Sequence, residues 1–101
     1  YYSAMLFSKI SKALSDDNRL KILKFLSDGQ KNVTQVADKL NVEENLASHH
    51  LRILASLGFL KNEKKGREVF YRINEAKFVN LVRDLHRSPI FREILKEAIK
   101  E

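Results

Sequence analysis

The chain has 101 residues, which is enough for one small domain and too few for two well-buried cores. Apolar residues make up 44% and charged residues 32%, no apolar run approaches the roughly 18 to 20 residues of a membrane span, and no secretory signal is recognisable. With no cysteine and a net charge of +6, the sequence excludes disulfides and indicates a cytoplasmic protein with an anionic partner, most commonly nucleic acid.

The chain begins with four residues that precede its single methionine, Met5. We expect residues 1–4 to be left over from recombinant expression, so that one domain comprises residues 5–101. Within it, the helical spacing of apolar residues predicts a short first helix over residues 6–14.

A second helix is predicted to start at Ser15 or Asp16, whose side chains suit a helix N-cap, and to end at Gly29. Carboxylates near its start favour the positive end of the helix dipole. The apolar residues expected on its buried side are Leu20, Ile22, Leu23, Phe25 and Leu26.

Two further helices are predicted close together in the chain. Residues 33–40 carry apolar side chains at i, i+3, i+4 and i+7. A new helix follows, capped by Asn41 with Glu44 three residues on, in an arrangement similar to a capping box, or beginning nearer Glu43; Gly58 ends it. Because only a few residues separate these helices, they predict a helix-turn-helix.

Beyond Gly58 the apolar pattern changes from helical to alternating, which predicts a two-stranded β-hairpin formed by residues 59–63 and 67–73. Gly66 is able to take a positive φ in the turn. One face of the second strand is expected to hold Val69, Tyr71 and Ile73, and the other Phe70 and Arg72. The hairpin tip contains Lys64, Lys65, Gly66 and Arg67.

The last third of the chain is predicted to be helical again, with Pro89 as an interruption. The first apolar stripe is formed by Phe78, Leu81, Val82 and Leu85. The second, after the proline, is formed by Phe91, Ile94, Leu95, Ala98 and Ile99.

Two adjacent histidines lie in the second helix of the helix-turn-helix. Neighbouring helical residues point about 100° apart, so His49 and His50 cannot share one role simply by being neighbours. His50 lies on the apolar stripe, which favours a packed histidine bonded to a nearby backbone group. His49 lies on the polar stripe beside Ser48, on the face that contacts bases and phosphates in a helix-turn-helix, although a solvated side chain is the simple alternative.

At this point the sequence resembles the ArsR/SmtB family of winged helix-turn-helix repressors. The stretch KALSDDNRLKILKFL is similar to the family's second helix, ASHHLRILASLGFL to its recognition helix and KKGREVFYRI to its wing, in the family's order. The resemblance implies a mostly helical α+β winged fold and a homodimeric repressor that binds double-stranded operator palindromes and releases them on binding an inducer, often a metal ion.

The resemblance also implies which residues face each partner. For DNA these are Glu44, Asn45, Ser48, His49 and Arg52, with the wing residues Lys64, Lys65 and Arg67. For the dimer they are Leu6 and Ile10 of the first helix, with Phe78, Leu81, Val82 and Leu85 after the wing.

One departure from the family concerns charge. Serine and glutamine are usual where this chain has Glu43 and Glu44, and a carboxylate can accept from cytosine N4 but repels phosphate. The alternative is that both glutamates serve the helix dipole. Residues 61–72 include five basic and two acidic residues, and this net charge of +3 in the wing compensates for the two glutamates. The alternative is that the tip of the hairpin is merely solvated.

No metal site or cofactor is predicted. Without cysteine, thiolate sensing is excluded, and the positions that resemble the family's Asp-x-His pair hold Glu75 and Lys77, of which lysine cannot be the usual ligand. Asp84 and His86 lie later and diverge in direction, which favours a solvated helix end. Any inducer is therefore expected to be an unidentified small molecule.

Two other functions are weighed against DNA binding. An enzyme using His49 or His50 as a base lacks a nucleophile motif, a phosphate loop and paired carboxylates, so no enzymatic activity is predicted. A winged-helix module that binds protein instead of DNA is favoured by Glu43 and Glu44 alone. We therefore predict a sequence-specific transcriptional regulator that acts as a repressor and not as a conventional metal sensor.

Overall fold

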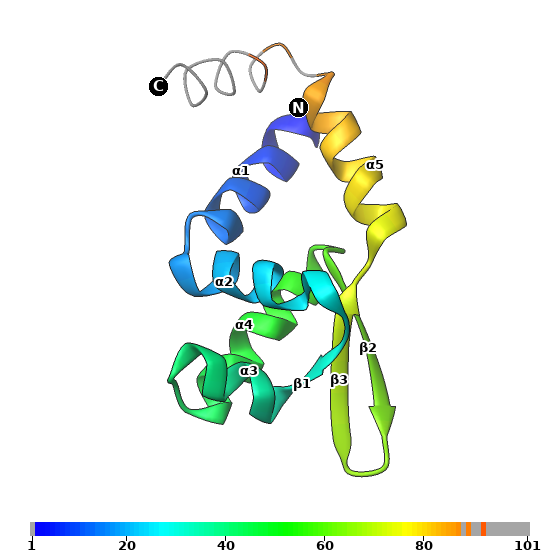
Figure 1. Ribbon diagram of the computed structural model, residues 1–101. Helices are drawn as coiled ribbons and strands as arrows, with labels where there is room; N and C mark the ends of the chain where they lie inside the picture. Colours follow the sequence, from blue (N-terminus) through cyan, green and yellow to red (C-terminus); the bar gives the residue numbers. More distant parts are fainter. Residues whose placement is uncertain (1, 88, 90–91, 93–101) are drawn as a thin grey trace.

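The structure is a computed structural model that describes residues 2–87, 89 and 92, with only the backbone described for residues 2–4, 6, 7, 81, 82 and 85. Helices form most of it, and a small sheet lies at one side (Figure 1). The elements in chain order are α1 (Tyr2–Leu14), α2 (Asp17–Phe25), the 3-10 turn η1 (Leu26–Asp28), β1 (Lys31–Asn32), α3 (Val33–Leu40), α4 (Glu44–Ser56), β2 (Leu60–Lys65), β3 (Glu68–Ile73) and α5 (Glu75–His86).

The core lies where α2, α3 and α4 meet the base of the sheet. Its largest fully buried side chains are Phe59, Ile22, Leu51, Leu54 and Val36. They come from α2, α3, α4 and the residue before β2, so one continuous core supports the helix-turn-helix and the hairpin together. Each such side chain contributes roughly 1.5 to 3 kcal/mol by leaving water.

The starts of α2 and α3 are fixed by side-chain caps. The carboxylate of Asp16 accepts from the backbone N–H of Asn18 (2.9 Å) and of Arg19 (3.2 Å). Asn32 and Gln35 form a reciprocal capping box at the start of α3. These bonds satisfy donors that a helix start otherwise leaves without a partner.

The start of α4 corrects one prediction. Asn41 does not cap α4, because it ends α3 in the left-handed conformation (φ 55°), which asparagine adopts more readily than most residues. The N-cap of α4 is Glu43, without a side-chain bond to the backbone, so the alternative start near Glu43 is the one observed.

The sheet has three antiparallel strands in the order β1-β3-β2, whereas two were predicted. The hairpin pairs Lys65 with Glu68 across a two-residue turn, and Gly66 takes a φ of 64° there. The additional strand, β1, pairs Lys31 with Tyr71 on the other edge of β3. The hairpin is thereby anchored to the helix-turn-helix at its base.

Three further predictions differ from the structure. Leu20 was expected to be buried, but it is 46% exposed, because it lies on the same side of α2 as the exposed Asp17 and Lys24. The first helix begins at Tyr2, so residues 2–4 continue it. The second helix ends at Phe25, and η1 fills the gap to Gly29. The predicted stripe of Phe91, Ile94, Leu95, Ala98 and Ile99 lies outside the described residues.

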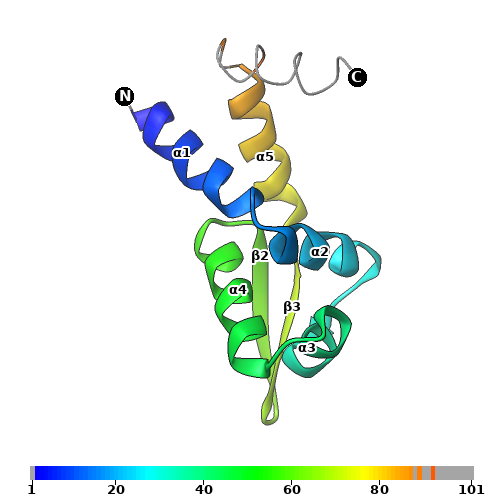
Figure 2. The same ribbon diagram turned by 90° about the vertical axis from the view of Figure 1, so that its left-hand side faces the viewer.

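Helices α1 and α5 extend from the domain at the end opposite the hairpin tip (Figures 1 and 2). The base of α5 is held by Phe78, whose ring centroid lies 5.2 Å from that of Phe59. Within the described residues, no helix has the length and apolar character needed to cross a lipid bilayer.

Candidate nucleic-acid interface

Helix α4 has two distinct faces. Ala47, Leu51 and Leu54 are fully buried on the face toward the core. At 100° per residue, Asn45, His49 and Arg52 lie on the opposite face, and all three are exposed. Ser48 is half-buried at the edge between the two faces. The residues predicted to contact DNA therefore form one polar surface with hydrogen-bonding side chains of different chemistry.

The first turn of α4 carries the two carboxylates that depart from the family pattern. Glu43 and Glu44 are both exposed. The Oε1 atom of Glu44 accepts a hydrogen bond from the hydroxyl of Thr34 in α3 (2.5 Å). This bond gives Glu44 a role in joining the two helices, and its acidic charge suits the helix N-terminus. A DNA contact by Glu44 stays a prediction.

The hairpin carries exposed positive charge at its tip. Lys64, Lys65 and Arg67 are all exposed. Lys65 has local partners, since its Nζ lies 3.6 Å from a carboxylate oxygen of Glu63 and 5.3 Å from the ring centroid of Phe70. Figure 2 shows the tip projecting beyond the helices at the same end as the start of α4. One surface thus combines the polar face of α4 with a cationic hairpin.

His50 is buried, as predicted, but its hydrogen-bond partner differs from the predicted one. It is 5% exposed and accepts a hydrogen bond at Nδ1 from Nε of Arg19 in α2 (3.2 Å), where a backbone partner was expected. Burial lowers the pKa of His50 below its ordinary value. The neutral imidazole can accept at Nδ1, and the protonated ring cannot.

The predicted dimer residues divide into two groups. Ile10 is 3% exposed and belongs to the core, and Phe78 packs on Phe59 within the same chain, so both are already largely occupied. Val79 on α5, which the sequence analysis did not single out, is 50% exposed. The side chains of Leu6, Leu81, Val82 and Leu85 lie outside the described residues.

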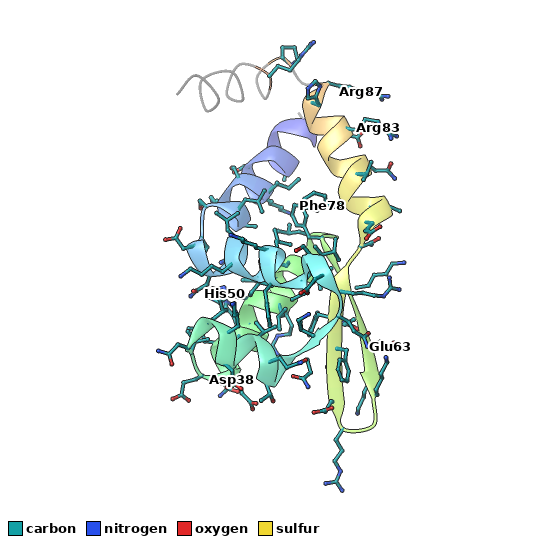
Figure 3. The ribbon with its side chains drawn as sticks, in the orientation of Figure 1. Asp38, His50, Glu63, Phe78, Arg83 and Arg87 are labelled. Atoms are coloured by element: carbon teal, nitrogen blue, oxygen red, sulfur yellow. The ribbon has the colours of Figure 1, made fainter. Side chains whose placement is uncertain are left out.

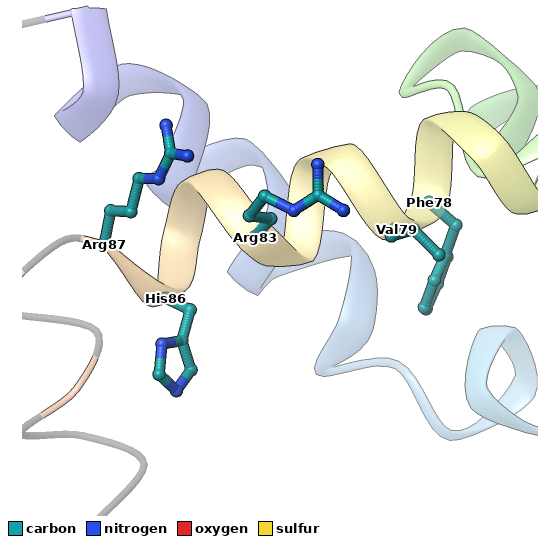
Figure 4. Close-up of a pocket in the computed structure, with 5 residues that line it drawn as sticks. All are labelled: Phe78, Val79, Arg83, His86 and Arg87. Carbon is teal, nitrogen blue, oxygen red and sulfur yellow. The ribbon is translucent and has the colours of Figure 1, made fainter.

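Helix α5 also has a surface hollow with an apolar floor. Its described lining residues come from this helix and the residue that follows it (Figure 4), namely Phe78, Val79, Arg83, His86 and Arg87. Among the potential metal ligands, Glu75, Asp84 and His86 are exposed. In the described part of the chain, no three histidine, aspartate or glutamate side chains come together as a metal site would require.

Two residues were not predicted to flank or contact α4, one beside its polar face and one on the side toward α2. Leu46 is 42% exposed beside the polar face of α4. The sequence could have revealed it, because Leu46 is an apolar residue that falls outside the buried stripe of the helix. Arg19 contacts α4 from a position 31 residues earlier in the chain, a separation that periodicity within one helix cannot reveal.

Comparison with known proteins adds to this geometry. Residues 16–62 match the family described as bacterial regulatory protein, arsR family. The chain is 42% identical over 76 residues to a cadmium resistance transcriptional regulatory protein, a CadC homolog of Staphylococcus aureus, across 74% of this chain and 63% of that protein. It is 33% identical over 67 residues to the transcriptional repressor SdpR of Bacillus subtilis, across 66% of this chain and 74% of the repressor.

A solved structure is similar over most of the chain. It is the NMR structure of a homodimeric winged helix-turn-helix DNA-binding domain from Mycobacterium bovis, with 28% identity, a TM-score of 0.67 and 84% of both chains covered. The chain spans less than two thirds of the staphylococcal relative's length. The relatives are named as transcriptional regulators, in agreement with the prediction of a regulator and not an enzyme. The winged helix-turn-helix fold is confirmed, and the chain belongs to the arsR family of bacterial regulatory proteins.

Proposed function

We propose that this chain binds double-stranded DNA as a homodimer and represses transcription at the sites it occupies. The observation that carries the proposal is the single surface formed by the exposed face of α4 and the cationic hairpin tip, at one end of the molecule (Figure 2). A helix of this diameter fits the major groove of B-form DNA, and basic side chains on a hairpin gain from the phosphates beside it. The homodimeric DNA-binding domain from Mycobacterium bovis supports the same arrangement.

Each side chain on this surface has a chemistry suited to one part of the duplex. Asn45 is able to pair with the N6 and N7 edge of adenine, and Arg52 with O6 and N7 of guanine or with a phosphate. Ser48 and His49 supply further hydrogen bonds to base edges or to phosphates. Contacts from Lys64 and Arg67 to phosphates position the protein without reading sequence.

Dimerisation supplies the second recognition helix. α1 and α5 extend away from the DNA-facing end, where they are free to meet the same helices of a second chain across a two-fold axis. Such a dimer presents its two α4 helices to half-sites about 34 to 36 Å apart, or a multiple of that spacing. We therefore expect the operator to be a palindrome.

The proposed regulation involves a small molecule and not a conventional metal site. The staphylococcal relative is named for cadmium resistance, whereas this chain contains no cysteine to bind such a soft metal as a thiolate. Lys77 stands where the resemblance expects a second ligand after the wing. These two sequence features support an inducer that is not a metal ion.

A gel-shift screen tests DNA binding directly. Genomic fragments, including the DNA upstream of the gene for this protein, are incubated with the chain at two salt concentrations against random DNA of equal length. We expect at least one fragment to shift at protein concentrations that leave random DNA free. Uniform failure to shift any DNA at low salt would instead favour the winged-helix module that binds protein.

A further inference from the structure

The contact between Arg19 and His50 joins α2 to the recognition helix in the interior of the domain. Figure 3 shows His50 where the two helices meet. Apart from Tyr71 with its phenol hydroxyl, His50 is the one buried side chain with polar atoms among the residues that the structure describes. Arg19 Nε lies 3.2 Å from its Nδ1 atom, within the ordinary range for an N–H donor. A polar group is costly to bury unless it is bonded in this way.

This contact lies on the reverse side of the surface proposed to read DNA. His49 follows the polar face, and the next residue, His50, is held from α2. Side chains extend about 5 to 6 Å from the axis of a helix, so a rotation of α4 by about 10° would move their ends by about 1 Å. That displacement exceeds the tolerated spread of hydrogen-bond distances. Fixing the rotation of α4 therefore matters for reading bases and little for contacting phosphates.

The hydrogen bond requires a neutral imidazole. Accepting at Nδ1 places the ring proton on Nε2, and a second proton on Nδ1 would turn the acceptor into a donor that faces the Arg19 guanidinium. Three charged or titratable groups act on His50. Arg19 and the neighbouring His49 oppose its protonation, and Asp16 at the N-cap of α2 favours it. A protonated His50 is thus repelled by Arg19 and attracted by Asp16.

We propose that Arg19 is a positioning residue, that it holds the recognition helix through His50, and that protonation of His50 releases this contact and weakens sequence-specific DNA binding. The proposal rests on the proposed DNA-binding function. It predicts a protein that discriminates its operator less well as the medium becomes acidic. Non-specific binding should change less, because phosphate contacts depend little on the exact rotation of α4.

The first test replaces the donor. Arg19→Met keeps a long side chain without a hydrogen-bond donor, and Arg19→Gln keeps an uncharged donor. We expect Arg19→Met to lower the ratio of specific to non-specific affinity by about tenfold at neutral pH, and Arg19→Gln to lower it less. Fluorescence anisotropy on the operator found by gel shift and on random DNA measures the ratio. A folded Arg19→Met protein with the wild-type ratio would overturn the proposal.

The second test removes the titration. Asn in place of His50 presents an amide oxygen near the position of Nδ1 and does not titrate, so His50→Asn should keep specific binding at neutral pH and lose its decline in acid. His86→Asn, at the end of α5, is the matched control and should keep the wild-type pH profile. If His50→Asn retains the wild-type decline, protonation of another group causes it and the proposal is wrong.

A third measurement needs no DNA and separates this proposal from the proposed function. Nitrogen NMR of the imidazoles should show the unprotonated nitrogen of His50 at Nδ1 near neutral pH, and its shift should change in Arg19→Met. A proton on Nδ1 near neutral pH would refute the contact even if the protein binds DNA tightly. Conversely, the expected NMR result with no DNA binding would confirm the contact and refute only the function that it serves.

Discussion

Removal of the three basic side chains at the hairpin tip should change the salt dependence of DNA binding. The variant is Lys64→Ala with Lys65→Ala and Arg67→Ala. Lys65 is already engaged by Glu63 and Phe70, so we expect Lys64 and Arg67 to contribute most. The wild-type dimer has two hairpins, and each should make about two to three phosphate contacts. Removing these contacts should make the plot of log K against the logarithm of the salt concentration shallower by about 4 to 5 units.

The magnitude can be stated as an affinity ratio. A slope difference of about 4 to 5 means that the advantage of the wild type over the variant shrinks about 250- to 1,000-fold when salt rises from about 50 to 200 mM. Anisotropy titrations at four salt concentrations measure the slope. Lys9→Ala with Lys12→Ala and Lys21→Ala removes the same charge from exposed positions on α1 and α2, and it should keep a slope near that of the wild type. An unchanged slope in the hairpin variant would refute the assignment of the hairpin to DNA.

Further predictions concern specificity, assembly, metals and pH. Ser48→Ala and His49→Ala should each weaken operator binding more than random-DNA binding, by about 1 to 3 kcal/mol, in the same anisotropy assay. Sedimentation equilibrium should give twice the 11.8 kDa chain mass for the wild type, and Leu81→Glu with Leu85→Glu should give monomers with much weaker operator binding. Equilibrium dialysis should find no tight stoichiometric zinc, and a tight site would contradict the proposal that the inducer is not a metal ion. Because burial lowers the pKa of His50, the unfolded chain binds more protons than the folded one as pH falls below about 6.5. Urea unfolding should therefore give a lower free energy of unfolding near pH 5.5 than near pH 7.5. This difference should be smaller in His50→Asn.

The two faces of α4 could be predicted from sequence because an uninterrupted helix converts spacing directly into direction. Ala47, Leu51 and Leu54 repeat at helical intervals, and burial of that stripe leaves Asn45 and His49 on the outside. The hairpin could be predicted equally well, since the alternation of apolar and polar residues and the glycine in the turn are local signals. Both features depend on residues close together in the chain.

The features that escaped prediction depend on tertiary contacts. β1 has two residues, too few for any periodic pattern, and it exists because β3 offers it an edge. Arg19 reaches His50 across 31 residues, so only the packing of α2 on α4 reveals the pair. Leu20 fits an apolar pattern but falls on the outer side of a short helix, where spacing alone is ambiguous. Asparagine suits either end of a helix, and in the structure Asn41 ends α3 in place of starting α4.

The central claim, that a homodimer reads a DNA sequence through α4, is tested most directly by selecting binding sites from random double-stranded DNA with the purified chain and sequencing the bound fraction. A two-fold protein with one recognition helix per subunit predicts enrichment of an inverted repeat whose half-site centres lie about one helical turn apart, or a multiple of it. Ser48→Ala or His49→Ala should then alter the preferred bases within each half-site. Recovery of no enriched sequence, or of a single asymmetric site bound by one chain, would contradict the account.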